Sequence, residues 1–480
     1  MNKRTKIVCT IGPACEKKSI LTRMVKAGMN VARLNFSHGT HENHKKLIEN
    51  IRFVAKKTGE PVAIIQDLQG PKIRLGVLPE EGIEIKKGEE VIFDTSKKEY
   101  KNKIVPITYD ELHRHLKKDE RILLADGKIE VKITEVIKTK IKTKVVVGGI
   151  ISSHKGLNVP DSKLRISALT EKDKEDALFG VENNVDYIAL SFVTDAKDII
   201  DLRFLIKEYE KKLKIKKEVP IRIIAKIERH EAVDNIEEIM DVVDGIMIAR
   251  GDLGMEIPAE QVPLVQKRLV DLALKYSKPV IVATQMLDSM QNNPRPTRAE
   301  VSDVANAVID HTDAVMLSNE TATGKYPIHT VKMMATIISE TEDSNYDRLH
   351  LQMSPTKKHG DTDDIITKLS RVIAEDTESK LILAASISGD TGRLISRYRP
   401  ELPIAVGTSS ERVRNQLNLS WGVIPFILLH CDSIEELVER SVSYLKKNKI
   451  VKKKDKIVVV AGEPVGQAGN INLLELKEIK

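Results

Sequence analysis

Short apolar segments that end in polar or glycine-rich residues recur along the first two thirds of the chain. Eight of them are predicted as strands, and the residues between them have the amphipathic periodicity of helices. Strands that are apolar along nearly their whole length indicate a parallel sheet that is covered on both faces. Eight β/α units predict a (β/α)₈ barrel, in which the active site lies at the carboxyl ends of the strands. The predicted strands are 6–10, 31–35, 63–67, 187–191, 221–225, 245–251, 280–284 and 314–318.

Two of the intervening helices have recognisable capping residues. Ser19 is predicted as the N-cap of one helix, and Gly28 as its stop. Thr297, followed three residues later by Glu300, predicts a capping box at the start of another helix. Both helices fall between predicted strands, as a β/α repeat requires.

The barrel pattern is interrupted between residues 72 and 167, where short strands and turns replace the β/α units. Asp126 and Gly127 lie between two apolar runs and predict a β-hairpin. We therefore expect an inserted β domain at 72–167, which leaves and re-enters the barrel next to Asp67. A domain tethered there could close over the barrel mouth as a lid. The barrel itself is expected to comprise 1–71 and 168–341.

A polar stretch at 342–363 predicts a linker. Beyond it, strands alternate with helical segments, which indicates a separate C-terminal α/β domain at 364–480. The strands predicted for this domain are 380–385, 403–407, 423–426 and 456–461.

Composition excludes several classes of function. The 77 basic and 70 acidic residues give a net charge of +7 and are interspersed. Aromatic residues make up only 4% and do not alternate with basic ones, so we expect no nucleic-acid partner. Cys9, Cys15 and Cys431 have no metal-ligand spacing and suit a reducing compartment. The N-terminus has no signal-peptide core and no stretch is long enough to span a bilayer, so we expect a cytoplasmic protein without a membrane partner.

Residues suited to chemistry follow two neighbouring predicted strands. Lys226 and Glu228 come after the run 221–225 and point to one face of the strand, because side chains alternate. Asp252 follows the run 245–251. The two carboxylates offer the hard oxygen ligands that Mg²⁺ prefers, and the ammonium can meet negative charge that develops on a substrate. The alternative is a strand-end ion pair of little energetic consequence.

Seven motifs lie in order along the chain, most of them at predicted strand ends: KIVCTIGP (6–13), NVARLNFSHG (30–39), AKIE (225–228), ARGDLG (249–254), ATQML (283–287), NPRPTRAE (293–300) and LSNET (317–321). Together with the inserted domain, they resemble the pyruvate kinase family over essentially the full length of the chain. The resemblance implies a glycolytic enzyme that moves the phosphoryl group of phosphoenolpyruvate to ADP, giving pyruvate and ATP. Phosphoryl transfer needs mainly positioning and charge neutralisation, which a divalent metal and cationic side chains supply.

The resemblance also implies residue roles. Mg²⁺, for which Mn²⁺ can substitute, would bridge the substrate's carboxylate and enolate oxygen. A threonine hydroxyl is a poor acid, so the proton is expected to reach the enolate through a water that Thr284 orients. Arg165, where many relatives have Asp, leaves the lid's contacts to the nucleotide open. The implied positions are Arg33 on the phosphate, Lys226 on the transferring group, Glu228 and Asp252 on the metal, Gly251, Asp252 and Thr284 around the substrate, Ser318 and Glu320 on the proton route, and His38 and Arg74 on the nucleotide side.

The segment QDLQGPKIR (66–74) departs from the commonest family pattern. Many pyruvate kinases have Glu at the position of Lys72 and Thr at that of Leu68, and need K⁺; this chain resembles the subgroup with Lys. A tethered ammonium can place one positive charge where K⁺ would sit, so we expect K⁺ not to be required. The alternative is that Lys72 points to solvent at the hinge. The resemblance places the monovalent-cation site among Asn35, Ser37, Asp67 and Leu68.

The segment SISGDTGR (386–393) joins a strand to a helix in the C-terminal domain. Its hydroxyls, backbone amides and helix N-terminus could hold a phosphate, and it resembles the family's effector loop, with the loop 462–470 beside it. The charge of Asp390 opposes a phosphate, so a plain strand-to-helix turn is the alternative. The effector residues implied for a phosphorylated metabolite are Ser386, Ser388, Gly389 and Thr391.

The resemblance has two consequences for the whole chain. The family's usual assembly is a homotetramer, which we expect here. The family's additional phosphocarrier-like segment is expected to be absent, because the sequence ends at Lys480.

Other interpretations compete with this one. His38, His41 and His44 have a spacing that could bring two imidazoles to a transition metal, although a nucleotide-side loop with two surface histidines is the simpler account. A Mg²⁺-dependent lyase on a related phosphoenolpyruvate-binding barrel could also use a Glu and Asp pair, but it would not explain the lid, Arg33 and Lys72 together. A catalytically silent metabolite sensor is disfavoured because the reactive residues are present.

Overall fold

The computed structural model describes residues 3–125, 127–162, 167–215, 219–349, 362–463 and 469–480. Its centre is a closed barrel of eight strands in the order β1-β16-β15-β14-β13-β12-β3-β2, all paired in parallel. The predicted fold class is therefore confirmed. The barrel strands are β1 (Lys6–Thr10), β2 (Val31–Asn35), β3 (Ala63–Asp67), β12 (Tyr187–Leu190), β13 (Arg222–Ile227), β14 (Gly245–Ala249), β15 (Val280–Ala283) and β16 (Ala314–Leu317).

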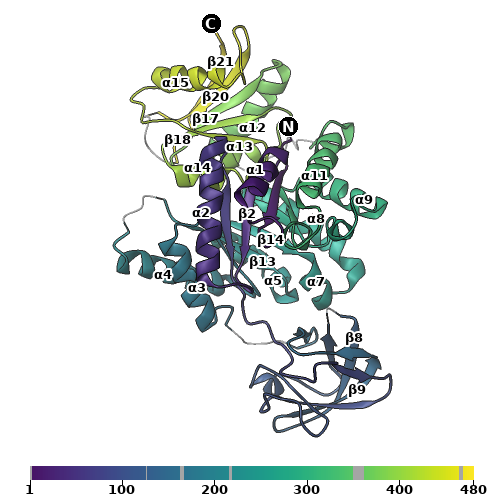
Figure 1. Cartoon of the computed structure of the whole chain (residues 1–480). Coiled ribbons are helices and arrows are strands. Elements are labelled where there is room, and N and C mark those ends of the chain that lie inside the picture. Colours follow the sequence, from purple (N-terminus) through teal and green to yellow (C-terminus); the bar gives the residue numbers. More distant parts are fainter. Residues whose placement is uncertain (1–2, 126, 163–166, 216–218, 350–361, 464–468) are drawn as a thin grey trace.

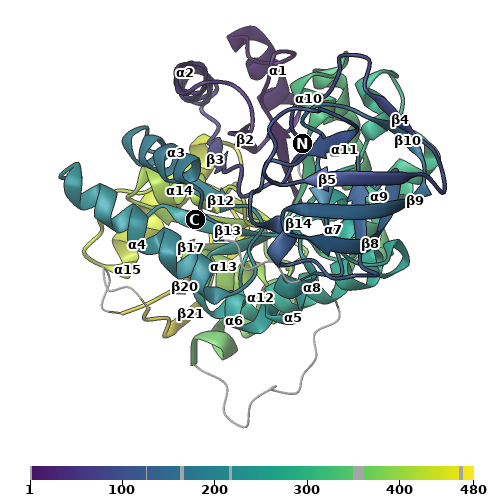
Figure 2. The same cartoon turned by 90° about the horizontal axis from the view of Figure 1, so that it is seen from below.

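Two layers of apolar side chains stabilise the barrel, because successive residues of a strand point to opposite faces. One set packs between the strands and the surrounding helices, and the other fills the interior. The helices form the outer ring (Figures 1 and 2). They are α1 (Lys18–Ala27), α2 (His41–Thr58), α3 (Glu171–Glu182), α4 (Ala196–Lys212), α5 (His230–Asp234), α6 (Ile236–Val242), α7 (Arg250–Glu256), α8 (Val262–Tyr276), α9 (Arg298–Ile309), α10 (Asn319–Ala322) and α11 (Pro327–Glu342).

The two predicted caps have different outcomes. In α9 the capping box is confirmed, since the Thr297 hydroxyl accepts from the Glu300 N–H and the Glu300 carboxylate accepts from the Thr297 N–H. In α1 the prediction of Ser19 as N-cap is wrong. The carbonyl of Lys17 accepts from the amides of Ile20 and Leu21, so Lys17 is the N-cap and Ser19 lies in the first turn. Gly28 ends α1 as predicted, with φ of 120°.

The inserted β domain, which we call the lid, lies at the opposite end of the barrel from the C-terminal domain (Figure 1). It has a six-stranded sheet, β11-β7-β8-β9-β5-β6, a two-stranded sheet, β10-β4, and a core of its own. The predicted hairpin joins β7 and β8 through Gly127, with φ of 78°, while Asp126 lies outside the described residues. The strands are β4 (Ile83–Ile85), β5 (Glu90–Asp94), β6 (Ile104–Pro106), β7 (Arg121–Leu124), β8 (Ile129–Ile137), β9 (Lys140–Val147), β10 (Gly149–Ile151) and β11 (Leu157–Asn158).

The C-terminal domain is a five-stranded sheet, β19-β18-β17-β20-β21, with helices packed on it. Its last strand is antiparallel and was not among the predicted strands. No described helix here or elsewhere is both long and apolar enough to cross a bilayer. The elements are α12 (Thr362–Asp376), β17 (Leu381–Ala385), α13 (Asp390–Ser396), β18 (Ile404–Thr408), α14 (Glu411–Leu417), β19 (Val423–Ile427), α15 (Ile434–Lys447), β20 (Lys456–Ala461) and β21 (Leu473–Glu478).

The N-terminal segment connects the barrel to the C-terminal domain. Strand β1 closes the barrel by pairing with both β2 and β16. Arg4, just before β1, forms an ion pair with Glu401 at 2.7 Å. Lys6, the first residue of β1, donates to the carbonyl of Val423 at 2.7 Å. One short segment therefore depends on strands and loops from the far end of the sequence.

Candidate active site

Five polar side chains continue the inward-facing rows of the barrel strands. The interior apolar cluster includes Val8, Val31, Ile65, Ala189 and Ile224, and the residue two positions further along is polar in each case. Because side chains alternate along a strand, these polar residues also point into the barrel, at its carboxyl end. They are Thr10, Arg33, Asp67, Ser191 and Lys226, and all five are buried.

Lys226 lies at the centre of this group. Its Nζ is 2.8 Å from Glu228 Oε1 and 3.3 Å from Asp67 Oδ1, and it donates to Ser191 Oγ at 2.7 Å. Burial alone would lower the pKa of Lys226, but the carboxylates of Asp67 and Glu228 outweigh it and hold the pKa well above its usual value. The side chain is therefore a fixed ammonium at working pH.

Asp67 joins the two cations of the site. Arg33 Nε donates to Asp67 Oδ2 at 2.6 Å, and Arg33 Nη1 donates to Thr10 Oγ1 at 3.0 Å. Burial would raise the pKa of Asp67, but Arg33 and Lys226 together lower it, so the carboxylate stays charged. Two inward-facing cations held by a shared carboxylate can bind an anionic substrate from the barrel mouth.

Glu228 and Asp252 fit a divalent metal. Glu228 is buried and accepts a hydrogen bond from the Phe192 N–H at 2.8 Å. Burial raises the pKa of Glu228, the nearby ammonium of Lys226 opposes that rise, and the charge of Asp252 adds to it. Two carboxylates that repel each other at one strand edge are hard oxygen donors whose repulsion a divalent cation would relieve.

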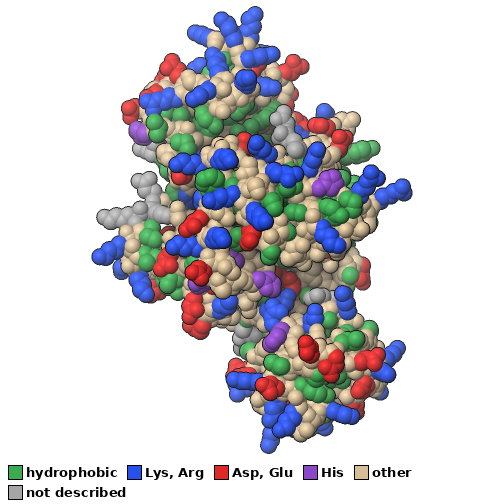
Figure 3. Space-filling view, in the orientation of Figure 1, with side chains coloured by type: hydrophobic (Ala, Val, Ile, Leu, Met, Phe, Trp, Pro, Cys, Tyr) green, Lys and Arg blue, Asp and Glu red, His purple; other side chains and the backbone are tan. Residues whose placement is uncertain are grey.

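Lys72 reaches the site from the lid hinge. Its Nζ is 3.2 Å from Asp252 Oδ1, so among the described residues its ion pair is with Asp252 and not with Asp67. A cavity of about 30 Å³ lies beside this pair, between the hinge strands and the barrel rim. Figure 3 shows the surface hollowed between the barrel and the lid. The residues that line the 30 Å³ cavity are Pro71, Lys72, Ile73, Leu157, Asn158, Phe192, Thr194, Arg229 and Glu256.

Thr284 has a strained backbone. Its φ is 73°, which is unusual for a β-branched residue and is found mainly at functional sites. Its Oγ1 accepts from the Gly251 N–H at 2.8 Å and donates to the carbonyl of Ala283 at 2.6 Å. Arg250 donates to the Thr284 carbonyl at 2.8 Å, while both its terminal nitrogens bind the Asp303 carboxylate at 2.7 Å. The strained turn is therefore fixed from α7 and α9.

Glu320 organises the neighbouring strand end. Its carboxylate accepts from the amides of Ser318, at 2.7 Å, and Leu287, at 3.3 Å. Burial raises the pKa of Glu320. The side chain thus joins the loops after β15 and β16, and its partner Leu287 is three residues after Thr284.

The residues expected at a monovalent-cation site cluster near Asp67. Asn35 Oδ1 accepts from the Ser37 N–H at 3.1 Å. Leu68 is buried, and its carbonyl accepts from Ser191 Oγ at 2.7 Å. Asn35 and Asp67 are register partners in β2 and β3.

The residues expected on the nucleotide side are less closely grouped. Arg74 lies on the hinge, where its guanidinium donates to the carbonyl of His154 at 3.0 Å. His41 and His44 have separate partners: His44 stacks on Phe36 and bonds to the His38 carbonyl, while His41 pairs with Asp176. His44 is buried, so the expectation that it is a surface residue is wrong. Arg165 lies outside the described residues.

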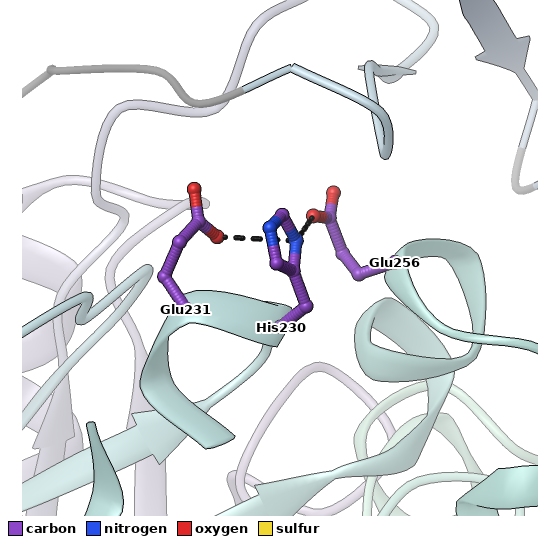
Figure 4. A group of neighbouring side chains, drawn as sticks. All are labelled: His230, Glu231 and Glu256. Atoms are coloured by element: carbon purple, nitrogen blue, oxygen red, sulfur yellow. Dashed lines mark ion pairs between the residues drawn. The ribbon is translucent and has the colours of Figure 1, made fainter. Parts of the chain in front are cut away.

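Among the described residues, one group has donor atoms close enough to hold a metal ion: His230, Glu231 and Glu256 at the barrel rim (Figure 4). His230 Nδ1 is 3.3 Å from Glu231 and 3.6 Å from Glu256. Arg229, however, binds both oxygens of Glu231, at 2.9 and 3.0 Å. Interaction with the carboxylate of Glu256, and after it the charge of Glu231, raise the pKa of His230. The group therefore balances its own charges, and we interpret it as an ion-pair cluster. Asn158 of the lid donates to Glu256 at 3.2 Å, so the lid contacts the barrel at this cluster.

The predicted effector loop uses its polar groups internally. Ser386 Oγ accepts from the Gly389 N–H at 3.0 Å, and Ser388 Oγ donates to Asp390 at 2.6 Å. Arg222 of the barrel donates to Asp390 and to the Ser388 carbonyl, each at 3.1 Å. Thr391 lies in the first turn of α13. In the loop 462–470, residues 464–468 lie outside the described residues.

Sequence reasoning missed three residues that shape the site. Ser191 could have been found, because it continues the inward-facing row of its strand in the same way as Asp67 and Lys226. Arg250 and Asp303 lie on different helices, and no sequence signal joins them.

Comparisons with known proteins agree over both main parts of the chain. The family model "Pyruvate kinase, barrel domain" matches residues 2–331, and "Pyruvate kinase, alpha/beta domain" matches residues 364–476. A pyruvate kinase from Geobacillus stearothermophilus is 44% identical over 481 residues, which cover 100% of this chain and 81% of that protein. One from Clostridium acetobutylicum is 40% identical and is covered over 100% of both chains. A crystal structure of a pyruvate kinase from Cryptosporidium parvum is similar with a TM-score of 0.91 and 34% identity, over 100% of this chain and 97% of that one.

Proposed function

Because the chain belongs to the pyruvate kinase family, we propose that it transfers the phosphoryl group of phosphoenolpyruvate to ADP, giving pyruvate and ATP in glycolysis. The observation that carries this proposal is the buried group of Lys226, Arg33 and Asp67 at the carboxyl end of the barrel. It presents two fixed positive charges to the barrel mouth, beside a pair of carboxylates suited to a metal. That is the equipment that phosphoryl transfer requires.

The metal proposed is Mg²⁺, with Mn²⁺ as a substitute, held by Glu228 and Asp252. When bound, it supplies positive charge to the oxygens of the substrate. Lys226 is 2.8 Å from Glu228, so an ammonium and the metal ligands share one strand end. Removal of divalent metal with EDTA should abolish activity, and Mg²⁺ should restore it.

Side chains and amides of the protein bind the substrate, neutralise charge and deliver the proton. Arg33 and Lys226 bind and orient the phosphate, and the fixed charge of Lys226 neutralises the enolate as it forms. Thr284 orients the water that delivers a proton, with Ser318 and Glu320 on the same side of the site. The N–H of Gly251 donates to Thr284, so of these two amides the one available to bind the substrate carboxylate is that of Asp252. His38 and Arg74 are proposed on the nucleotide side.

One coupled assay tests the function. Pyruvate formation from phosphoenolpyruvate is followed with lactate dehydrogenase, with and without ADP. We expect pyruvate only when ADP and Mg²⁺ are both present. Pyruvate formation without ADP would indicate a lyase or phosphatase, and no turnover under any condition would indicate a sensor.

We further propose that activity does not depend on K⁺, because the ammonium of Lys72 supplies the monovalent positive charge. The proposal rests on the residue pattern of the segment 66–74, because the ion pair of Lys72 is with Asp252, at 3.2 Å, and not with Asp67. Activity should be full in a buffer whose only monovalent cation is tetramethylammonium. The variant Lys72→Glu should acquire a need for K⁺, while Lys87→Glu, on an exposed lysine of the lid, should not.

Ionic strength is held constant in this comparison, so that general screening does not contribute. Strong stimulation of the unmodified enzyme by K⁺ would contradict the proposal. Leu68 and Gln69 lie in the same segment and are to be changed together with Lys72 if the single variant is inactive.

Regulation and assembly are proposals of the same kind. A phosphorylated metabolite is proposed to bind Ser386, Ser388, Gly389 and Thr391, and to lower the apparent KM for phosphoenolpyruvate. Binding would have to displace the internal hydrogen bond between Ser388 and Asp390. Ser388→Glu should abolish the response, because the added carboxylate repels a phosphate. A screen of sugar phosphates and nucleoside monophosphates that leaves the saturation curve unchanged would favour a plain turn. The proposed assembly is a homotetramer in the cytoplasm.

A further inference from the structure

A small polar cavity lies at the seam between the barrel and the C-terminal domain. Its volume is about 10 Å³, close to the minimum that holds one water-sized species. The barrel contributes the end of α8 and the start of β15, and the C-terminal domain contributes α13 and the loop before β19. The charged residues of its lining are Lys278, Asp313, Arg393, Arg397 and Arg399, and the hydroxyls are those of Ser277, Ser396 and Ser420.

Two positive charges at this cavity have unmet hydrogen-bonding capacity. The side chain of Arg393 is 5% exposed; its Nη2 donates to the Ser388 carbonyl at 3.1 Å, but Nε and Nη1 are buried without a partner among the described residues. The ammonium of Lys278 has no carboxylate within ion-pairing distance in the described part of the chain. The hydroxyl of Ser420 is likewise buried and unpartnered within the described residues. A buried guanidinium with two free N–H groups is costly unless an acceptor meets it.

The other two cations of the lining, Arg397 and Arg399, are already satisfied. Arg397 pairs with Asp364 and donates to Ser277 Oγ at 3.1 Å. Arg399 binds Asp313 at 2.9 Å and the His311 carbonyl at 2.7 Å. Among the cations of the lining, the unpaired donors in the described part of the chain are therefore those of Lys278 and Arg393.

The neighbouring carboxylates do not balance these charges. Asp244 pairs with Arg203 at 2.9 Å and with Arg222 at 3.5 Å. Asp390 pairs with Arg222 at 3.1 Å and, more distantly, with Arg393 at 3.7 Å. Four cations, Arg203, Arg222, Lys278 and Arg393, thus share two carboxylates. Burial, and after it the positive charge of Arg222, lower the pKa of Arg393 to about 10. Burial also lowers the pKa of Lys278.

We propose that this cavity binds one monatomic anion of the size of chloride, held between Lys278 of the barrel and Arg393 and Ser420 of the C-terminal domain. Charge selects an anion over water, because a water molecule would accept hydrogen bonds without reducing the positive excess. Volume selects a monatomic anion over phosphate or sulfate. The bound anion connects the two domains at a place separate from the hydroxyls of the loop 386–391.

Bromide is the probe, because it replaces chloride and scatters anomalously. Crystals of the full chain soaked in bromide should show an anomalous peak in this cavity, within about 3.5 Å of Lys278 Nζ and of an Arg393 nitrogen. The peak should be absent in crystals of Arg393→Met. No peak in the unmodified protein, a peak that persists undiminished in the variant, or equal occupancy by sulfate would overturn the proposal.

A second measurement does not depend on crystals. The melting temperature is compared in potassium chloride and potassium gluconate at the same ionic strength. Chloride should raise it by roughly 2–5 °C in the unmodified protein, because the anion binds the folded state. Lys278→Met should lose most of that shift, and Lys275→Met, on an exposed lysine in the last turn of α8, should keep it. The same shift in both variants would show that chloride acts elsewhere.

Discussion

Lys226 acts through a charge that does not titrate in the working range. Its ammonium is held by Asp67 and Glu228, and these carboxylates keep its pKa well above the usual value. A group whose pKa is raised stays protonated at neutral pH, so Lys226 can neither accept a proton there nor release one readily. Its contribution is electrostatic stabilisation, and the pH profile of kcat should have no limb from Lys226 between pH 6 and 9.

Replacing Lys226 with Met tests this role. The variant loses charge stabilisation that is largest in the transition state, so kcat should fall by roughly 10²–10³ or more, with a smaller change in the KM for phosphoenolpyruvate. Lys207→Met, on an exposed lysine of α4, is the control and should be unaffected. Steady-state kinetics with both substrates varied make the measurement. Near-normal kcat in Lys226→Met would contradict the assignment.

Asp303 is expected to matter although it lies outside the barrel mouth. It holds Arg250, which in turn holds the carbonyl of Thr284, whose φ is 73°. Asp303→Asn weakens that pair and should lower kcat by roughly 10–100-fold, because small displacements of a positioning group are costly. Asp201→Asn, which removes an exposed ion pair on α4, should have little effect.

The melting temperature separates positioning from folding in the Asp303 variant. We expect it to stay within about 3 °C of the unmodified protein while kcat falls. A loss of activity that is matched by unfolding at the assay temperature, or full activity with a normal melting temperature, would count against the positioning role.

At the scale of single elements, the barrel strands were predictable and several other features were not. Strands β1, β2 and β3 have the bounds that the sequence predicted, because a strand buried on both faces is apolar along its whole length. Strand β21 was missed since its side chains are only partly buried and it pairs on one side only. The N-cap of α1 was misplaced because Lys17 provides a carbonyl, and no side chain, to the cap.

The residues of the candidate site were likewise predictable only in part. Residues that continue a strand's inward row, such as Asp67 and Lys226, carry a signal in the sequence. The link from Asp303 through Arg250 to Thr284, and the ion pair of Lys72 with Asp252, depend on how distant segments pack. Local periodicity contains no information about such contacts.

The capping box of α9 provides a test of local stability. Thr297→Ala removes the hydroxyl that accepts from the Glu300 N–H, at 3.2 Å, and should cost about 1 kcal/mol. Amides in the first turn of α9 should then exchange roughly fivefold faster, if they open locally. Thr336→Ala, at an exposed position within α11, should be neutral or slightly stabilising, since Ala favours helix. Equal exchange in the two variants would contradict the role of the cap.

At the scale of the whole molecule, burial controls the chemistry of the thiols. Cys9 and Cys15 are fully buried, and Cys431 is 4% exposed. Burial raises the pKa of Cys15 to about 11, from a usual value of 9.0, and raises that of Cys9. At pH 9 an unfolded thiol is half ionised, whereas Cys15 is only about 1% thiolate, so it reacts slowly in the folded chain.

Labelling with a thiol reagent measures this difference. At pH 8 the folded protein should show no rapid reaction at Cys9 or Cys15, and urea should expose all three cysteines of the chain. Because the native thiols hold their protons more tightly than unfolded ones, stability should decline as the pH rises above about 9. Rapid labelling of Cys15 in the folded state would show that the N-terminal part of the barrel opens readily.

The position of β1 between β2 and β16, the second and last barrel strands in the sequence, also affects the order of pairing during synthesis. Thr10 and its partner Leu317 are separated by 307 residues. At roughly 5–20 residues per second, β1 waits on the order of 15–60 s before that partner leaves the ribosome. During this interval β2 is its sole strand neighbour, and an unpaired strand edge is a template for wrong pairing. The nascent chain is therefore most exposed to aggregation, and most in need of a chaperone, until residue 317 has emerged.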